Sequence, residues 1–410
     1  MFNFKVSESW YKKAAESEKN MEISAGTLIP LEPVTEKEGS TYKVPLTTIL
    51  EINVHPNAER LEVAKIYGFD VVIQKGVFKV GDTVLYIPVD SILPQRVEEF
   101  LFAPDAKIKL NKSRVRAAKI RGFVSQGMVV PLDEFFELFP LGKKHYDLEG
   151  DYSLGLGITK YQPPETAQPG PKTPRNKPKE NPYFHKYGGL DSIKWYPELF
   201  TEGEEVIITE KIHGTNFRAG WVPSVPNTLW KKVKKFFGQL PEFEFVWGSN
   251  NVQLQERGKH TGFYEEDVYG KMVRKYDLRN VLKPGEVIYG EIYGPGIQKN
   301  YDYSAKDHEL IVFDLKLQGK ESSLFVDFDL MNEMLLGKSL RIVPVLYRGP
   351  YNKEMSKTLT EGPSVLDPNQ KVREGIVIKP VKETETFMGR KVLKWVADSY
   401  LLDFNNTDNH

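Results

Sequence analysis

The feature that most constrains this chain is a short apolar run that ends in a single lysine and a glycine turn. Residues 206–208 read as a buried strand, Lys211 follows them, and Gly214 ends the extended pattern. A lysine beside a glycine turn is well placed to act as a nucleophile. The turn lets a phosphate approach the backbone, and the Asn216 amide can bind ribose or phosphate oxygens. Taken alone, the segment is equally typical of a lysine that reaches from a strand end into solvent.

Four further segments place acids and lysines beside predicted strands later in the chain. Each alone is typical of an ordinary strand edge, so the information lies in their order after Lys211. The segments are 287–294 with Glu291, 310–314 with Phe313 and Asp314, 373–380 with Glu374 and Lys379, and 391–395 with Lys391 and Lys394.

Size and composition bound the class of protein. A chain of 410 residues predicts two domains plus connections, and 40% apolar and 12% aromatic residues suffice for sizeable cores. Lysine plus arginine and aspartate plus glutamate both number 56, so any nucleic-acid surface must be a local patch. The absence of cysteine excludes disulfides, thiolate zinc sites and cysteine nucleophiles, and the seven histidines show no zinc-binding spacing.

The chain shows no signal segment and no apolar run of membrane-helix length. We therefore expect a soluble, intracellular protein of the cytoplasm, including one that a virus encodes and that acts in the host cytoplasm. On the same grounds we expect no membrane partner, and nothing in the sequence implies an obligate protein partner.

Residues 43–132 are rich in short apolar runs separated by turns, a spacing that predicts a small closed β-barrel. The predicted strands are 44–52, 62–66, 71–73 and 83–87. Within residues 1–40, only 7–21 suggest a helix, and no chemistry is apparent there. Two helices are predicted further on. Residues 229–237 carry Trp230, Val233 and Phe237 at helical spacing with four lysines, which predicts a surface helix or an RNA contact, and residues 266–281 predict a core helix.

A basic stretch lies near the end of the predicted barrel. Apolar residues alternate with several of its cations, as on a strand with one wet face. One interpretation is a solvated surface, and the other is a groove that follows a nucleic-acid phosphate backbone. The stretch holds no acid and contains Lys107, Lys109, Lys112, Arg114, Arg116, Lys119 and Arg121.

The order of the five segments resembles the motifs of the covalent nucleotidyltransferases, and the first has the form K-x-[DH]-G-x-N found in ATP-dependent RNA ligases. The later four resemble motifs III, IIIa, IV and V. The run His55-Pro56-Asn57-Ala58 and the later Ser125-Gln126-Gly127 resemble the OB module at the front of one RNA ligase family. DNA ligases and capping enzymes usually place this module after the catalytic domain, so the domain order favours an RNA ligase.

The resemblance implies an α+β fold, in which an N-terminal OB-like β-barrel is joined by a proline-rich linker to an ATP-grasp-like nucleotidyltransferase domain of antiparallel sheets and helices. Residues 163–182 hold seven of the 27 prolines and predict the linker. The expected divisions are an extension at 1–40, an OB-like nucleic-acid-binding domain at 41–150, the linker at 151–186 and the nucleotidyltransferase domain at 187–410.

The resemblance also implies the reaction. AMP would be joined to Lys211, passed to an RNA 5′-phosphate and displaced by a 3′-hydroxyl, with ATP and Mg²⁺ or Mn²⁺ as cofactors and a nicked duplex or broken tRNA as RNA substrate, in RNA repair. Catalysis would fall to Lys211, Glu291, Lys379 and Lys394, and metal binding to Glu291 and Glu374. Nucleotide binding would involve Glu210, Ile212, Asn216, Phe313, Glu374, Lys379 and Lys394.

The sequence departs from the family pattern at two places. Asn250 stands where relatives carry the arginine of a G-S-R motif, and Arg257 is a candidate substitute. Motif V is usually K-x-K, whereas Lys391 and Lys394 are three residues apart, and Lys394 fits better. His213 is interpreted as a positioning residue. Two alternatives stay open, namely a GTP-dependent capping-type nucleotidyltransferase and an RNA-binding protein with an incomplete ligase domain.

Overall fold

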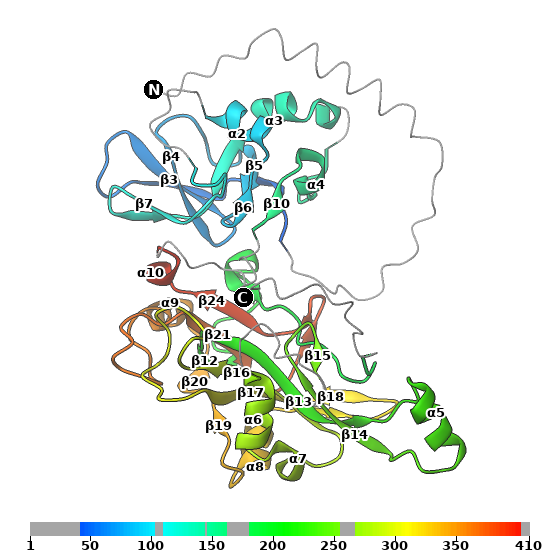
Figure 1. The fold of residues 1–410 in the computed structure, drawn as a ribbon. Helices are drawn as coiled ribbons and strands as arrows, with labels where there is room; N and C mark the ends of the chain where they lie inside the picture. Colours follow the sequence, from blue (N-terminus) through cyan, green and yellow to red (C-terminus); the bar gives the residue numbers. More distant parts are fainter. Residues whose placement is uncertain (1–41, 103–109, 144–145, 162–179, 255–266, 403–410) are drawn as a thin grey trace, which may run out of the picture. The chain divides into compact units, whose positions relative to one another are not determined.

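The computed structural model describes residues 42–102, 110–143, 146–161, 180–254 and 267–402 of the chain. The fold is mixed α+β, as expected, and divides between residues 161 and 162 into two compact units (Figure 1). In this part of the chain, no helix has both the length and the apolar character needed to cross a membrane. The predicted helix at residues 7–21 and most of the proline-rich linker lie outside the described residues.

The N-terminal unit is OB-like and consists of short antiparallel strands. Strands β2 (Glu51–Val54), β3 (Leu61–Ile66) and β4 (Phe69–Gln74) form a meander. Strand β5 (Thr83–Ile87) lies between β1 (Leu46–Thr48) and β9 (Met128–Pro131). The strand expected at 44–52 is therefore two strands, because Ile49 N donates to Asp82 O while Leu50 N donates to Lys65 O, so the chain changes sheets there.

Two small ribbons and three short helices complete this unit. Strand β6 (Ser91–Ile92) pairs with β10 (Thr159–Lys160), and β7 (Ala118–Ile120) pairs with β8 (Phe123–Ser125). The helices are α2 (Gln95–Leu101), α3 (Leu132–Leu138) and α4 (Ser153–Leu156), with a 3-10 turn at Pro140–Lys143.

The linker is shorter at both ends than residues 151–186. Leu156 and Ile158 are buried in the core of the N-terminal unit, so that unit continues past residue 150. Phe184 is buried in a core of the second unit together with Tyr187. Proline content marked the middle of the connection, whereas its ends are set by apolar side chains that pack into one core or the other.

The second unit contains two large sheets. The first has the strand order β11 (Asp191–Ser192), β24 (Leu393–Val396), β21 (Gly375–Pro380), β12 (Glu205–Lys211) and β20 (Val345–Pro350). The second has the order β15 (Gln253–Leu254), β14 (Phe243–Gly248), β13 (Thr215–Pro223), β16 (Glu286–Tyr293), β17 (Glu309–Gln318) and β18 (Ser323–Phe325), and β19 (Arg341–Ile342) also pairs with β17. Neighbours are antiparallel except for β11–β24 and β17–β19.

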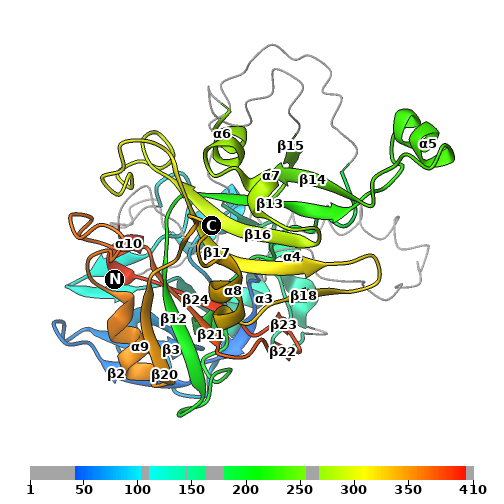
Figure 2. The same ribbon diagram turned by 90° about the horizontal axis from the view of Figure 1, so that it is seen from below.

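Short helices accompany these sheets. They are η2 (Ile193–Trp195), α5 (Leu229–Phe236), α6 (Val268–Lys275), α7 (Leu278–Val281), α8 (Phe328–Leu335), α9 (Lys353–Thr360) and α10 (Asp398–Leu401), and a hairpin joins β22 (Glu385–Thr386) to β23 (Gly389–Arg390). The single helix expected at 266–281 is two helices, because Asp277 takes a left-handed conformation with φ of 46°. Helix α5 stands away from the sheets, beyond the ends of β13 and β14 (Figure 2).

Candidate active site

Strand register places the three predicted lysines on one face of the five-stranded sheet. Lys211 lies opposite Gly375, Lys394 lies opposite Val377, and Lys379 is two residues beyond Val377 on the same strand. Side chains alternate between the faces of a sheet, so these three lysines share one face, whereas the isoleucines between them pack into the core on the other. The register of β12, β21 and β24 therefore aligns the lysines.

Lys211 contacts the carboxylate of Glu374, which lies just before β21. Lys211 Nζ donates to Glu374 Oε1 at 2.6 Å, and both side chains are largely buried. The other carboxylate oxygen lies 3.7 Å from His213 Nδ1. Burial, with the Lys211 cation nearby, lowers the pKa of His213 to about 3, so this ring is neutral at physiological pH. A neutral ring supports the interpretation of His213 as a positioning residue.

Glu291 reaches the same place from the second sheet. The Gly214 N–H donates to its carboxylate, and a Cβ on Gly214 would lie 2.3 Å from Ile292 O and 2.8 Å from Glu291 Cγ. Only glycine allows this approach. Burial raises the pKa of Glu291 to about 8; the Lys211 cation opposes this shift and the Glu374 carboxylate adds to it. A bound cation would favour the ionised carboxylate, so Glu291 suits a metal.

Asn216 lies directly opposite Glu291 in the pairing of β13 with β16. Its Oδ1 atom is buried and accepts no hydrogen bond from the residues that the structure describes. A buried acceptor without a donor is costly, which points to a polar group of a ligand at this position. Lys211, Glu374, Glu291 and Asn216 thus gather where the chain passes from β12 in one sheet to β13 in the other.

The residues fit a divalent metal that is held mainly by its substrate. No group of three or more histidine, aspartate or glutamate side chains among the described residues is arranged to hold a metal ion. Mg²⁺ is commonly bound by one or two carboxylates together with substrate phosphates and water. Glu291 and Glu374 supply that number of carboxylates.

Lys379 spans from the first sheet to the second instead of contacting Glu374. Its Nζ donates to Asp314 Oδ1 at 2.9 Å and to the Phe313 carbonyl at 3.3 Å, and it is buried. Arg390 donates to Asp314 Oδ2 at 3.0 Å, and the Tyr187 hydroxyl donates to the same oxygen at 2.5 Å. Although burial opposes ionisation, the Lys379 and Arg390 cations hold the pKa of Asp314 below its ordinary value. Both carboxylate oxygens of Asp314 therefore accept hydrogen bonds, one from Lys379 and the other from Arg390 and Tyr187.

The remaining nucleotide-binding candidates are dispersed. Glu210 follows the alternation to the face opposite Lys211, and its Oε2 accepts from Val365 N at 2.7 Å. Ile212 is buried, and Lys394 is buried on the face that carries Lys211. Phe313 lies at an irregularity in the β16–β17 register, half-buried, with its ring 4.9 Å from that of Tyr187.

Several residues around the turn were not predicted from the sequence. His213 N donates to the Tyr303 hydroxyl at 2.8 Å, and the Tyr400 hydroxyl lies 3.3 Å from His213 Nδ1. Gln298 Nε2 donates to Gly214 O at 2.7 Å. These side chains come from 84 to 187 residues away along the chain, so no local pattern indicated them.

Asn250, at the position where the G-S-R motif would carry an arginine, contacts the backbone of another segment. Its Oδ1 accepts from Tyr187 N at 2.9 Å. The neighbouring buried arginine is Arg218 on β13, which donates from Nε to Ser249 O at 2.9 Å and lies over the Phe184 ring. Arg257, the candidate substitute, lies outside the described residues.

The basic stretch of the N-terminal unit is not one wet strand. Of its described residues, 110–121, only 118–120 form a strand. Arg114 is buried, with its Nε donating to Asp90 Oδ1 at 2.9 Å and its guanidinium over the Tyr161 ring. Arg114 is thus held in the interior of the unit by Asp90, and its role as an RNA contact stays a prediction. Arg116 is half-buried, whereas Lys112, Lys119 and Arg121 are exposed. Lys107 and Lys109 lie outside the described residues.

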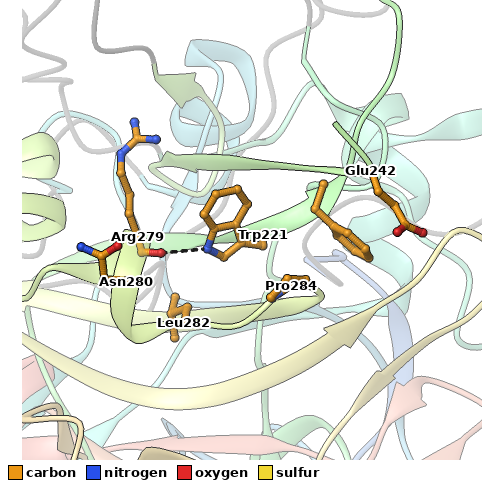
Figure 3. A pocket seen from close by; sticks show the side chains of 7 residues that line it. Trp221, Glu242, Arg279, Asn280, Leu282 and Pro284 are labelled. Carbon is orange, nitrogen blue, oxygen red and sulfur yellow. Dashed lines mark hydrogen bonds between the residues drawn. The ribbon is translucent and has the colours of Figure 1, made fainter. Parts of the chain in front are cut away.

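A hollow of about 480 Å³ lies elsewhere in the second unit, on the β13–β14 ribbon beside α7 (Figure 3). Trp221 donates from its indole N–H to Arg279 O at 3.1 Å within this lining. The lining contains neither a lysine nor any of the predicted site residues. Lys211, Glu374, Glu291 and Asn216 therefore lie outside this hollow.

Comparison with solved structures shows the fold. Naegleria gruberi RNA ligase has a similar structure: a lysine-to-alanine variant with ATP and manganese is 22% identical, with a TM-score of 0.65 over 88% of this chain and 98% of that chain. An arginine-to-alanine variant with ATP and manganese is 22% identical, with a TM-score of 0.64 over 87% of this chain and 97% of that chain. A form with pyrophosphate has the same identity, TM-score and coverages. The fold is that of an RNA ligase.

Family models identify the two parts. Residues 204–396 match the RNA ligase family, and residues 44–132 match an OB-fold domain. Residues 204–396 are therefore an RNA ligase family domain, and the OB-fold domain precedes this domain in the sequence.

Proposed function

We propose that this chain is an ATP- and divalent-metal-dependent RNA ligase that joins RNA 3′-hydroxyl and 5′-phosphate ends through AMP bound to Lys211. The observation that carries the proposal is the buried contact between Lys211 and Glu374 beside Glu291 at the turn between the two sheets. Structures of Naegleria gruberi RNA ligase variants, one with ATP and manganese and one with AMP and manganese, support the choice of nucleotide and metal.

In the first step, Lys211 Nζ forms a bond to the α-phosphorus of ATP, and the bond to pyrophosphate breaks. The amine must lose a proton beforehand, because a free lysine is protonated at neutral pH. Glu374 stabilises the ammonium form, so we expect the Lys211–Glu374 contact to open when the nucleotide binds. Lys394, on the same face, is placed to offset charge on the phosphates.

In the second step, a phosphate oxygen of the RNA 5′ end attacks the phosphorus of the AMP and releases Lys211. In the third, a 3′-hydroxyl attacks the RNA 5′-phosphorus, loses its proton and displaces AMP. A divalent cation, when bound, lowers the cost of negative charge on these phosphates. Glu291 and Glu374 would hold it, and Asn216 would orient the nucleotide through its buried Oδ1.

Labelling of the protein tests the proposal. Incubation with ATP labelled at the α-phosphate and Mg²⁺ should leave covalent label on the denatured wild-type protein and none on Lys211→Ala. Lys391→Ala is a matched control, since Lys391 is as buried as Lys211 and donates to Glu204 at 2.7 Å. Equal labelling of Lys211→Ala would contradict the proposal, and labelling from GTP alone would favour a capping-type transferase. A comparison of sealing rates on a broken tRNA and on a nicked duplex would identify the RNA substrate and test a role in RNA repair.

A further inference from the structure

Helix α5 exposes more large apolar side chains than its length leads one to expect. Trp230 is 68% exposed and Phe236 is 85% exposed, and Leu229, Val233 and Phe237 are exposed beside them. None of the residues that the structure describes covers these side chains. Contiguous exposed apolar groups of this kind mark an interaction surface.

The apolar and basic side chains of α5 lie on separate faces. At 3.6 residues per turn, the five apolar side chains fall within roughly a third of the circumference. The opposite side carries Lys231, Lys232, Lys234 and Lys235, and the helix contains no acid. Two lysines border the apolar face, and Lys234 Nζ lies 5.8 Å from the centre of the Trp230 ring.

The helix is already formed and anchored. The Thr228 side chain accepts from Lys231 N at 3.3 Å and caps the first turn, and Phe237 N donates to Val233 O at 3.1 Å in the last. Lys231 also contacts Glu244 on β14, which fixes the helix to its ribbon. A preformed helix does not lose further backbone freedom when it binds.

We propose that α5 binds the surface of an anionic lipid bilayer, with its apolar face inserted among the acyl chains and its lysines at the headgroups. Separation of a lysine-rich face from a face of tryptophan, phenylalanine and leucine is typical of helices that lie in the membrane interface. Lysine stems can extend along the apolar layer while their ammonium groups contact anionic headgroups. The expectation of no membrane partner rested on the lack of an apolar run of membrane-helix length, whereas a helix that lies on a membrane needs no crossing segment.

Two other partners fit the observations less well. Single-stranded RNA is bound by aromatic rings that stack on bases while cations beside them contact phosphates. Leu229 and Val233 have no such use, and the lysines of α5 mostly face away from the rings. A second copy of the chain would cover the apolar face but would bring two sets of lysines together.

Flotation of the full chain with vesicles tests this proposal. We expect binding to vesicles of phosphatidylcholine mixed with phosphatidylglycerol at low salt, and much weaker binding to phosphatidylcholine alone. The double variant Trp230→Ser/Phe236→Ser should lower the partition coefficient by about tenfold to a hundredfold, because two large apolar groups are lost. Lys232→Glu/Lys235→Glu should lower it on the order of tenfold or more, on anionic vesicles only.

Matched controls change the same residue types elsewhere. Phe387→Ser removes an equally exposed ring from the β22–β23 hairpin, and Lys357→Glu reverses an exposed lysine on α9. Both should bind vesicles as the wild type does, and all four variants should keep wild-type labelling with ATP, since α5 lies outside the candidate active site. Labelling therefore reports on the proposed ligase function separately from lipid binding.

Three results would overturn the proposal. The first is a wild type that floats with neither vesicle, and the second is an aromatic double variant that floats as well as the wild type. The third is that neither the wild type nor the aromatic double variant binds vesicles, and that the double variant has lost affinity for single-stranded RNA or has lost self-association in sedimentation velocity. Those last outcomes would assign the face to RNA or to a second copy.

Discussion

The charged side chains of the candidate active site differ from those of the basic stretch at residues 107–121 in where they lie. In the ligase unit, Lys211 contacts Glu374 and Lys379 contacts Asp314, and all four side chains are largely buried. In the N-terminal unit, Lys112, Lys119 and Arg121 are exposed. The exception there is the buried pair of Arg114 and Asp90.

This difference separates two kinds of contribution. Removing one partner of a buried pair leaves an uncompensated charge, so single substitutions in the ligase unit should have large effects. Exposed cations contribute little each, are screened by salt and add up over a long partner such as RNA. We therefore expect the largest effects from substitutions near the turn at Gly214 and the smallest from substitutions of exposed cations in the OB-like unit.

The largest effects are expected from Glu291→Ala and Lys394→Ala. Each should lower the rate of RNA sealing by on the order of 10²–10³, with a larger loss where a metal site collapses, because a charge contact made in the transition state is lost. Thermal melting should show both variants folded. Glu333→Ala, which changes an exposed glutamate on α8, is the control. Wild-type sealing in either folded variant would show that the site lies elsewhere.

The next effect concerns stability. Asp314→Asn removes the negative charge that Lys379 and Arg390 share, which should lower the free energy of unfolding by about 3–5 kcal/mol. The exposed pair of Asp329 and Arg348 offers a control, and Asp329→Asn should cost less than about 1 kcal/mol. Urea unfolding measures both.

The difference in stability between the wild type and Asp314→Asn should depend on pH. The pKa of Asp314 is lower in the folded protein than its ordinary value. Its contribution to stability is therefore present above about pH 4 and is lost as the pH falls below it. Wild type and Asp314→Asn should converge in stability at low pH, and a constant difference across that range would contradict the assignment.

An intermediate effect is expected from removing the N-terminal unit. The truncation should begin at Glu180, because Asn181 N donates to Gln253 Oε1 and its amide contacts Glu244. All five motifs are kept, so the truncated chain should still label with ATP but should seal nicked duplex poorly. Sealing equal to that of the whole chain at every salt concentration would show that the OB-like unit does not position RNA. Loss of labelling by the folded truncation would show that this unit helps to bind ATP or release pyrophosphate.

The smallest effects are expected at the exposed cations. Lys119→Ala and Arg121→Ala should each flatten the log–log salt dependence of RNA binding by about one unit, without changing labelling. Lys79→Ala changes an exposed lysine of the same unit outside the basic stretch and should leave the slope unchanged. A slope that does not change in the first two variants would place the RNA surface elsewhere.

Much of the ligase unit followed from the sequence because its central strands are continuous apolar runs. The run at residues 206–208 predicted β12, and the run that ends before Lys379 lies in β21. Glycine at position 214 predicted the turn that Glu291 approaches. The order of the family motifs supplied the rest of these assignments.

The side chains that hold the site in place could not be predicted in this way. Asp314 receives Lys379 from 65 residues away and Arg390 from 76 residues away. Tyr303 and Tyr400 reach His213 across similar or longer separations. In the N-terminal unit, alternation suggested a wet strand, but Asp90 draws Arg114 into the interior. Contacts between distant segments depend on tertiary packing, which no local pattern encodes.

The central claim is that Lys211 is the nucleophile, and peptide mapping of the labelled protein tests it most directly. The full chain is incubated with ATP and Mg²⁺, digested under conditions that preserve a phosphoramide bond, and analysed by mass spectrometry for AMP on each lysine. We predict AMP on Lys211 alone, and its loss on addition of RNA with a 5′-phosphate. AMP on Lys379, Lys394 or any other lysine, with Lys211 unmodified, would contradict the account.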